Sequence, residues 1–417
     1  MNTNTPKPNA IPPSKVVQAY LTSFGQKNTE QALSLIDDNA VWHIDGQLNV
    51  STVGLLKGKK HIRHWLENFP QNFLPRQFTI SQILEKENDV IVIGAFRHLI
   101  KKTGNTIGSG MVIHFTVQNG LIKRYQIFED SALLQRAFSE PTHDWVQQEI
   151  RINDTVYAYS DLGEGPVIIF AHGLFVDRTI FEHQVNELAT THRCIVLDMP
   201  GHSKSGFNKA GWTLDDIAED ILLMIEECSF GEQITFIGQS QGGMVGLLLA
   251  AKKPELISKL ILIGTSARAE YPERIESWLS LRETLRTGTK AQQEQAFLTI
   301  QNRVNTAHWL EANPELAKKE RNIMLSHHQE GITLALDAAT INRKDIRSTF
   351  NQITAKTLVV CGAEDQATPL ELSEEIAQNI AHAQLHILEG VAHHPPIEAP
   401  ETLTMLITDF IKSIKIL

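Results

Sequence analysis

Residues 234–243 read Ile-Thr-Phe-Ile-Gly-Gln-Ser-Gln-Gly-Gly, and the apolar run Met244–Ala251 follows at once. The β-branched and aromatic start is typical of a buried strand, so the segment predicts a strand, a sharp turn at Ser240 and a helix. Gly238 and Gly242 flank the serine because a side chain at either position would collide with the neighbouring strand and helix. Such a turn exposes a serine hydroxyl and aims it at the N-terminus of the next helix, which indicates a nucleophile.

Two later strand patterns end in an acid and a base. One apolar run closes at Asp365, and another further along the chain closes at His393. A serine hydroxyl needs a base of near-neutral pKa to take its proton, and a carboxylate behind the imidazole fixes its tautomer. Ser240, Asp365 and His393 are therefore predicted to form a catalytic triad, while the adjacent Glu364 and His394 are the alternative acid and base.

A third strand end predicts the remaining part of an oxyanion hole. The run Val167–Phe175 is apolar up to the turn formed by His172 and Gly173. The backbone N–H of Leu174 after that turn, together with the N–H of Gln241 after the serine, would bind the negative oxygen of a tetrahedral intermediate. His172 is expected to be structural and to support the turn.

Between Arg268 and Ile353 the apolar residues recur at helical spacing with charge on the opposite face. Because this segment stands between a strand and the acid strand, we expect a helical cap over the active site at about 269–350. Side chains there and in the His-Gly turn would line the substrate pocket, or would alternatively pack the cap helices together. The candidates are Phe175, Trp278, Phe297, Trp309 and Met324. The adjacent His327 and His328 point to different sides of a helix and therefore predict no metal site.

Several short motifs now carry a family resemblance. They are His172-Gly173, Asp198-Met-Pro-Gly201, Gly238-Gln-Ser240-Gln-Gly242, Gly362-Ala-Glu-Asp365 and Gly390-Val-Ala-His393. With them, residues from about 146 to 417 resemble an α/β-hydrolase, and most of all the small esterase and enol-lactonase-like members. The resemblance implies a mostly parallel sheet with helices on both faces, no cofactor and no metal, and hydrolysis of a carboxylic ester or lactone through an acyl-enzyme. Carbon–carbon bond hydrolysis uses the same triad and is an alternative.

The first 140 residues follow a different pattern, with helices before a long sheet. Four runs of alternating apolar and polar residues predict strands, and Gln118-Asn119-Gly120 between the last two predicts a tight hairpin. The expected elements are helices at 16–24, 30–36 and 59–69 and strands at 40–44, 78–84, 89–98, 110–117 and 121–128. This order indicates an α+β cone in which a curved antiparallel sheet wraps the helices.

Residues 14–137 resemble the SnoaL-like, ketosteroid-isomerase-like family in this order of elements, in Asp37–His43 and in the segment from Asn119 to Asp130. That family includes isomerases, cyclases, dehydratases and domains that only bind ligands or dimerise. The resemblance therefore implies an accessory or dimerising domain. A bifunctional enzyme is the alternative, favoured if a polar pocket has His43 or Asp130 at its bottom. The candidate pocket residues are Trp42, His43, His98, His114, Tyr125 and Asp130.

Composition limits the partners and the compartment. The chain has 417 residues, a formal net charge of −10 and a pI near 5.9. An acidic balance without a basic block argues against nucleic acid or an anionic membrane as a partner. The sequence has no apolar run of signal-peptide or membrane-spanning length. Three cysteines, an odd number, favour reduced thiols in the cytoplasm.

The patterns together predict two domains and their boundaries. A disordered polar tail is expected at 1–13, the SnoaL-like domain at 14–137, a linker at 138–145 and the hydrolase domain at 146–417. The broad sheet face of the first domain would be a liability in a monomer, so we expect a homodimer. The remaining expected partner is a small-molecule ester or lactone substrate.

Overall fold

The computed structural model describes residues 11–46, 50, 52–101, 106–138, 145–231 and 233–412. The chain divides into two compact units, Met1–Val146 and Gln147–Leu417, and each has its own hydrophobic core. Residues 1–10 of the expected tail and residues 139–144 of the expected linker lie outside the described part of the chain.

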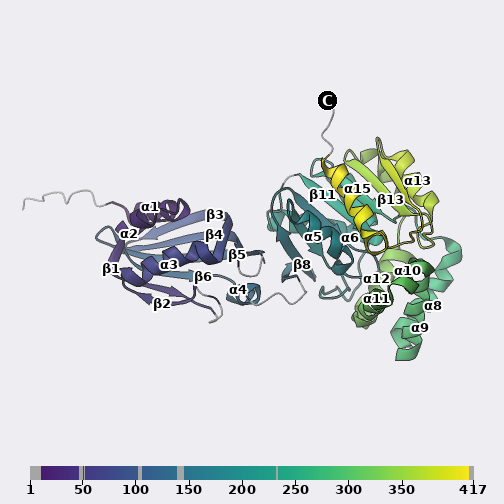
Figure 1. Cartoon of the computed structure of the whole chain (residues 1–417), viewed down its shortest axis with the longest axis horizontal. Helices are drawn as coiled ribbons and strands as arrows, with labels where there is room; N and C mark the ends of the chain where they lie inside the picture. The colour runs from purple at the N-terminus through teal and green to yellow at the C-terminus, as the bar shows by residue number, and fades with distance from the viewer. Residues whose placement is uncertain are drawn as a thin grey trace, which may run out of the picture. The chain divides into compact units, whose positions relative to one another are not determined.

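The N-terminal unit is a six-stranded sheet with helices α1 and α3 against it (Figure 1). Its strands are β1 (Ile36–Ile44), β2 (Gly54–Lys57), β3 (Phe73–Lys86), β4 (Asp89–Ile100), β5 (Thr106–Gln118) and β6 (Leu121–Phe128), and its helices are α1 (Pro13–Gly25), α2 (Thr29–Ser34), α3 (Lys59–Asn72) and α4 (Ser131–Phe138). The strand order is β2-β1-β6-β5-β4-β3. This arrangement confirms the predicted α+β class.

Local sequence explains most of this unit, with three exceptions. The hairpin between β5 and β6 turns at Asn119 and Gly120, whose φ angles are 53° and 76°, as a turn of type I′ requires. By contrast, β1 pairs with β6 in parallel, so the sheet is not wholly antiparallel. The sequence analysis also missed β2 and α4, which are too short to show a clear period.

Aromatic side chains fill the space between the helices and the sheet. Trp42 on β1 is completely buried and packs on Tyr20 of α1, Trp65 of α3 and Tyr125 of β6. The distances between ring centroids are 5.9, 5.2 and 4.7 Å. Contacts of this kind stabilise a core beyond the area that they bury. The apolar residues at helical spacing and those that alternate along the strands thus pack together in one hydrophobic core.

The C-terminal unit is built on an eight-stranded, mostly parallel sheet. Its strands are β7 (Gln147–Ile152), β8 (Thr155–Gly163), β9 (Val167–Ala171), β10 (Arg193–Leu197), β11 (Ile234–Gln239), β12 (Ile257–Ile263), β13 (Lys356–Gly362) and β14 (Gln384–Leu388). The order is β14-β13-β12-β11-β9-β10-β8-β7, and β8 is antiparallel to both of its neighbours. The central strands are apolar on both faces because helices cover both, as parallel sheets require.

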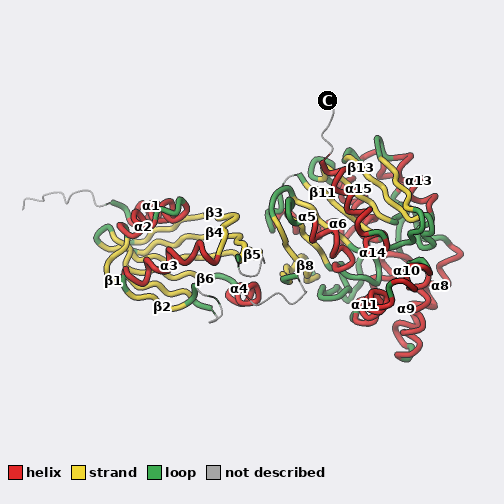
Figure 2. The backbone as a smooth tube through the Cα atoms, in the orientation of Figure 1, coloured by secondary structure: helices red, strands yellow, loops and turns green. Residues whose placement is uncertain are grey.

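Helices surround this sheet, as Figure 2 shows by colour. Those of the hydrolase core are α5 (Glu182–Leu188), α6 (Leu214–Glu227), α7 (Gln241–Lys252), α13 (Leu370–Asn379), α14 (Pro395–Glu398) and α15 (Pro400–Lys412). Between β12 and β13 the chain forms the expected cap, with α8 (Pro272–Thr287), α9 (Lys290–Val304), α10 (Ala307–Ala312), α11 (Pro314–Ser326) and α12 (Gln329–Leu336). The cap helices gather at one end of the sheet (Figure 1). The predicted α/β class with a helical cap is confirmed.

A buried imidazole holds the turn that follows β9. His172 has no exposed surface, and its Nε2 accepts a hydrogen bond of 2.9 Å from the backbone N–H of Met199. Its Nδ1 therefore carries the proton and donates to the carbonyl oxygen of Gly173 at 2.7 Å. His172 thus supports the turn, in agreement with the structural role expected for it.

Two further buried imidazoles bind the same turn two residues later, at Phe175. The backbone N–H of Phe175 donates to Nε2 of His202 at 3.2 Å. His327 of the cap donates from Nε2 to the carbonyl oxygen of Phe175 at 2.9 Å and accepts at Nδ1 from the backbone N–H of Ser203 at 3.0 Å. Phe175, whose φ is 70°, is held in this strained conformation by both histidines.

All three imidazoles bind the turn in their neutral form. Burial lowers the pKa of His172 to about 4 and lowers the pKa of His202 and of His327 below the ordinary value. The unfolded chain therefore binds protons at a higher pH than the folded chain does. The contribution of the neutral imidazoles to the free energy of unfolding is therefore fully present above a pH of about 6.5. It is lost as the pH falls from there towards 4.

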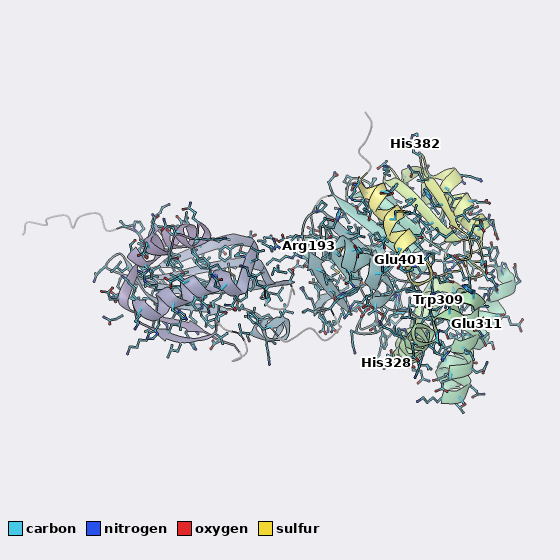
Figure 3. The ribbon with its side chains drawn as sticks, viewed as in Figure 1. Arg193, Trp309, Glu311, His328, His382 and Glu401 are labelled. Carbon is cyan, nitrogen blue, oxygen red and sulfur yellow. The ribbon has the colours of Figure 1, made fainter. Side chains whose placement is uncertain are left out.

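Replacement of His327 by glutamine tests this account of acid sensitivity. A glutamine amide can donate to Phe175 and accept from Ser203, but it takes up no proton. We expect the free energy of unfolding of His327→Gln to depend less on pH between 6.5 and 4 than that of wild type, by up to about 1.4 kcal/mol per pH unit. Urea denaturation followed by circular dichroism at several pH values measures this slope. His382→Gln, at an exposed position labelled in Figure 3, should leave it unchanged. Equal slopes for wild type and His327→Gln would contradict the account.

Candidate active site

Ser240 occupies the strained turn between β11 and α7. Its φ and ψ are 52° and −116°, and its backbone N–H donates to the carbonyl oxygen of Ile263 at 2.9 Å. A Cβ atom at Gly238 would lie 2.3 Å from the carbonyl oxygen of Gly242, and one at Gly242 would lie 2.0 Å from that of Ala171. Only glycine fits these positions, which is the physical reason for the motif.

The acid and base of the sequence prediction meet in the structure. Nδ1 of His393 lies 2.8 Å from Oδ2 of Asp365, and both side chains are almost completely buried. Asp365 stands in the loop after β13, where its carboxylate also accepts hydrogen bonds from the backbone N–H groups of Ala367 and Thr368 at 2.8 and 2.9 Å. The alternative acid, Glu364, is exposed.

The contacts of Asp365 keep its carboxylate charged. Burial alone would raise its pKa, but the charge and hydrogen bond of His393 and the two hydrogen bonds of Thr368 outweigh burial and lower the pKa. A charged Asp365 accepts a hydrogen bond from Nδ1–H of His393, so in the neutral ring Nε2 carries no proton. That is the tautomer that can act as a general base.

Ser240 and His393 line the same cavity, of about 70 Å³. Leu174, Phe175 and Gln241 line it as well. The backbone N–H groups of Leu174 and Gln241 donate to no acceptor in the part of the chain that the structure describes. Since Gln241 is the first residue of α7, its N–H stands at the positive end of that helix. Both groups are therefore available to bind an oxyanion.

The structure separates the predicted pocket residues. Phe175, Trp278 and Met324 line the cavity. Phe297 does not reach it, because its ring packs on the far side of Phe175 with a centroid distance of 5.5 Å. Trp309, labelled in Figure 3, also lies away from it, since its Nε1 donates to the carbonyl oxygen of Ile397 at 3.1 Å. Of the four predicted aromatic residues, Phe297 therefore packs on Phe175 and Trp309 joins the cap to α14.

Three titratable residues of the cavity were not predicted as pocket residues. Glu270 and Arg343 line it as an ion pair whose charged atoms are 3.7 Å apart, with both side chains more than nine-tenths buried. His394, considered only as an alternative base, lines it too. No motif marks Glu270 or Arg343, so sequence patterns could not have found them. The doublet His393-His394 was the one available signal.

The N-terminal unit contains a second cavity, of about 240 Å³. Its lining is mainly aromatic and includes Phe24, Trp65, Phe69, Phe73, Phe96 and Tyr125. Its polar lining residues include His98 and Glu129, together with the hydroxyl-bearing Tyr20, Thr29, Thr52 and Tyr125 and the exposed Lys27, Asn28 and Glu67. Burial lowers the pKa of His98 to about 4 and raises the pKa of Glu129 to about 7. Near neutral pH the imidazole is therefore uncharged, and the carboxyl is close to half protonated.

The other predicted pocket residues of this unit lie elsewhere. His43 pairs with Asp45 at 3.0 Å, and His114 pairs with Asp89 at 2.9 Å, in both cases at partly exposed positions. Asp130 accepts a hydrogen bond from the backbone N–H of Leu133 in the first turn of α4, and Trp42 is part of the core. Of the six candidates only His98 and Tyr125 line the cavity, and Glu129 was missed.

Two features are absent from the described residues. Over these residues, no helix is both long and apolar enough to cross a membrane. The same residues contain no group of three or more histidine, cysteine, aspartate or glutamate side chains placed to hold a metal ion.

Known proteins resemble the C-terminal unit in sequence and in structure. The 3-oxoadipate enol-lactonase 2 of Acinetobacter baylyi is 24% identical over 254 residues, which cover 61% of this chain and 90% of that protein. The solved enol-lactonase of Burkholderia xenovorans is 27% identical with a TM-score of 0.59, covering 64% of this chain and all of that one. A thermophilic esterase from Thermogutta terrifontis has the same identity, TM-score and share of this chain, and 98% of its own chain is covered.

Family models match both units. The model of the SnoaL-like domain matches residues 17–125, and the model of the alpha/beta hydrolase fold matches residues 166–400. The second match includes Ser240, Asp365 and His393 and spans more than half of the chain. The chain is therefore a member of the alpha/beta hydrolase fold family, with a SnoaL-like domain preceding its hydrolase unit.

Proposed function

We propose that the C-terminal unit hydrolyses carboxylic esters or lactones through an acyl-enzyme on Ser240. The observation that carries the proposal is the buried pair of Asp365 and His393, which opens on the same cavity as Ser240. Similarity to an enol-lactonase and to an esterase supports this choice of bond.

The proposed reaction has two balanced halves. Oγ of Ser240 attacks the carbonyl carbon while Nε2 of His393 takes its proton, and the N–H groups of Leu174 and Gln241 bind the oxyanion. The carbon–oxygen bond to the alcohol then breaks, and the imidazolium returns the proton to the leaving oxygen. Water attacks the acyl-enzyme with His393 again as base, which releases the acid and restores the serine. Asp365 stabilises the imidazolium in both halves.

The size of the cavity favours small acyl groups. A volume of about 70 Å³ is well below the roughly 300–1,000 Å³ of pockets that hold drug-sized ligands. Phe175 and Met324 close the cavity on the cap side, where they belong to an apolar cluster with Phe297. Acetyl and butyryl esters are therefore suitable first substrates.

Ser240→Ala should abolish hydrolysis without unfolding the protein. Since the members of a triad act as one unit, the loss of turnover on p-nitrophenyl acetate should be on the order of 10⁴-fold. A fluorophosphonate that reacts with activated serines should label wild type and spare the variant. Ser280→Ala, on an exposed position of α8, is the matched control and should be labelled and active like wild type. Labelling of Ser240→Ala would show that the nucleophile is another residue.

We further propose that the N-terminal unit joins two copies of the chain. Apolar side chains are exposed along its sheet, with Leu84 on β3, Val112 on β5 and Phe128 on β6 between 36% and 51% exposed. Val112 pairs with Phe128 of β6 on one side and with Ile93 of β4 on the other, and Ile93 pairs with Gln82 of β3. Paired residues point to the same face of a sheet, and so do residues two apart in one strand. Leu84, two residues after Gln82, therefore lies on the same face as Val112 and Phe128. A second copy of the same face would cover this apolar area.

A charge in this face should separate the subunits. Leu84→Glu places a carboxylate where the apolar surfaces would meet, so we expect a dimeric wild type and a monomeric variant in light scattering. Leu223→Glu, at an exposed apolar position of α6 in the other unit, should remain dimeric. Ester hydrolysis should persist in both variants, because each triad lies within one chain. A monomeric wild type would refute the dimer.

For the cavity of the N-terminal unit we propose binding of an apolar aromatic ligand rather than a second chemical step. Neither His43 nor Asp130 reaches it, and its lining is largely apolar and rich in aromatic side chains. We expect 1-aminoanthracene to gain fluorescence on binding there, with its amine beside Glu129. Leu21→Trp narrows the cavity and should reduce the gain, whereas Leu223→Trp should not. Equal fluorescence for the two variants would place the probe elsewhere.

A further inference from the structure

His394 is a second histidine in the hydrolase cavity, and the proposed chemistry does not use it. It is only 2% exposed, lines the cavity with Ser240, and its ring lies 5.5 Å from that of His393 between centroids. Nδ1 of His394 contacts Oε1 of Glu320 on cap helix α11 at 2.7 Å. Residues 74 positions apart in the chain thus form a buried acid–imidazole pair beside the triad.

The surroundings of Glu320 fix its charge and its orientation. Oε2 accepts hydrogen bonds from the side-chain amides of Gln301 at 2.6 Å and Asn305 at 2.9 Å, while Oε1 faces His394. Burial alone would raise the pKa of Glu320, but the contacts with His394, Gln301 and Asn305 outweigh it and lower the pKa. Glu320 is therefore a carboxylate that only accepts hydrogen bonds.

A carboxylate at Nδ1 determines which proton His394 carries. Because Glu320 has no proton to donate, the hydrogen bond requires the proton on Nδ1, and Nε2 of the neutral ring becomes an acceptor. Within the described residues, Nε2 of His394 has no hydrogen-bond partner, and it is not among the buried side-chain atoms left without one. It is therefore open to the cavity that contains Ser240.

We propose that His394 binds the substrate, and that Glu320 positions it as a hydrogen-bond acceptor. The inference rests on the ester hydrolysis proposed above and names its substrate class: esters or lactones that carry a hydroxyl or amide N–H a few bonds from the reacting carbonyl. The small shared cavity sets that distance, because one acyl group must reach both Ser240 and His394. A substrate with a carbonyl oxygen in place of the hydroxyl would form no hydrogen bond with His394, because that oxygen and the unprotonated Nε2 are both acceptors.

Matched esters measure this preference. The substrates are the methyl esters of 2- and 3-hydroxybutyrate, of the corresponding oxo acids, and of acids with a methyl branch in place of the hydroxyl. Rates are taken by titration at pH 8.5 and divided by those of hydroxide alone. We expect wild type to favour the hydroxy ester in kcat/KM over both analogues by about ten-fold at one of the two positions, the value of one good hydrogen bond.

Glu320→Gln reverses the tautomer without removing the side chain. Gln301 and Asn305 both donate to the Oε2 site, so the oxygen of the new amide must stay there, and its NH₂ must face Nδ1 of His394. Nδ1 then accepts, and the proton moves to Nε2, which becomes a donor. The oxo ester should gain about five- to ten-fold in kcat/KM, while the hydroxy ester, which can also accept, should change little.

This pattern separates substrate binding from a merely structural role. Damage to the cavity would lower both rates, whereas reversal of the tautomer raises one of them. In a His394→Asn background the further change Glu320→Gln should bring no gain on the oxo ester. If these variants lose stability in thermal melts, long-range ¹H–¹⁵N NMR of histidine in wild type decides the matter, since the inference requires the proton of His394 on Nδ1.

The outcomes distinguish this inference from the proposed function. Absence of hydrolysis for every ester overturns the proposed function and this inference with it. Hydrolysis without preference for the hydroxy ester, or a proton on Nε2 of His394 in wild type, overturns this inference alone. A gain of the oxo ester in Glu320→Gln supports both.

Discussion

The structure of the hydrolase unit depends on how closely α7 approaches β9 behind Ser240. The carbonyl oxygen of Ala171 lies where a side chain of Gly242 would be, so the helix begins immediately after the serine. That contact holds Ser240 in a left-handed conformation that costs about 1–3 kcal/mol. The surrounding parallel strands, buried on both faces, supply the packing that offsets this strain. The packing of the core thus places Ser240, the proposed nucleophile, at the cavity.

The second constraint is the attachment of the cap to the turn that carries the base. The backbone N–H of His393 donates to the carbonyl oxygen of Val304 at the end of α9. Glu398 accepts from the backbone N–H of Thr306, at the start of α10, and from that of Ala392. These bonds join cap and core beside His393, the proposed catalytic base. Movement of the cap would therefore displace the base, so the cap acts as part of the site.

These contacts explain which features of the protein could be predicted from its sequence. The strands, the glycines around Ser240 and the order of acid and base follow from local patterns, because each depends on neighbours in the chain. The direction of a cap side chain does not. Phe297 and Trp278 have similar helical settings, yet only Trp278 reaches the cavity, because the packing of α8 against α9 decides between them. The raised pKa of Glu129 could not be predicted from local sequence either, because it arises from burial by residues distant in the chain.

The polar groups of the two cavities differ in a way that fits different tasks. In the hydrolase unit three buried carboxylates each face a basic side chain: Asp365 faces His393, Glu320 faces His394, and Glu270 faces Arg343. The contacts of Asp365 and Glu320 lower the pKa of each carboxyl group, and each carboxylate accepts a hydrogen bond from Nδ1 of its imidazole. The proposed catalysis and the proposed substrate binding both use this arrangement. In the N-terminal unit burial instead moves the pKa of Glu129 towards neutrality and that of His98 away from it, so that neither must carry charge near neutral pH. An apolar molecule can therefore bind beside His98 and Glu129 without the large free-energy cost of burying an unpaired charge. This difference supports the proposals that hydrolysis takes place in the unit with the paired charges and that the N-terminal cavity binds a ligand.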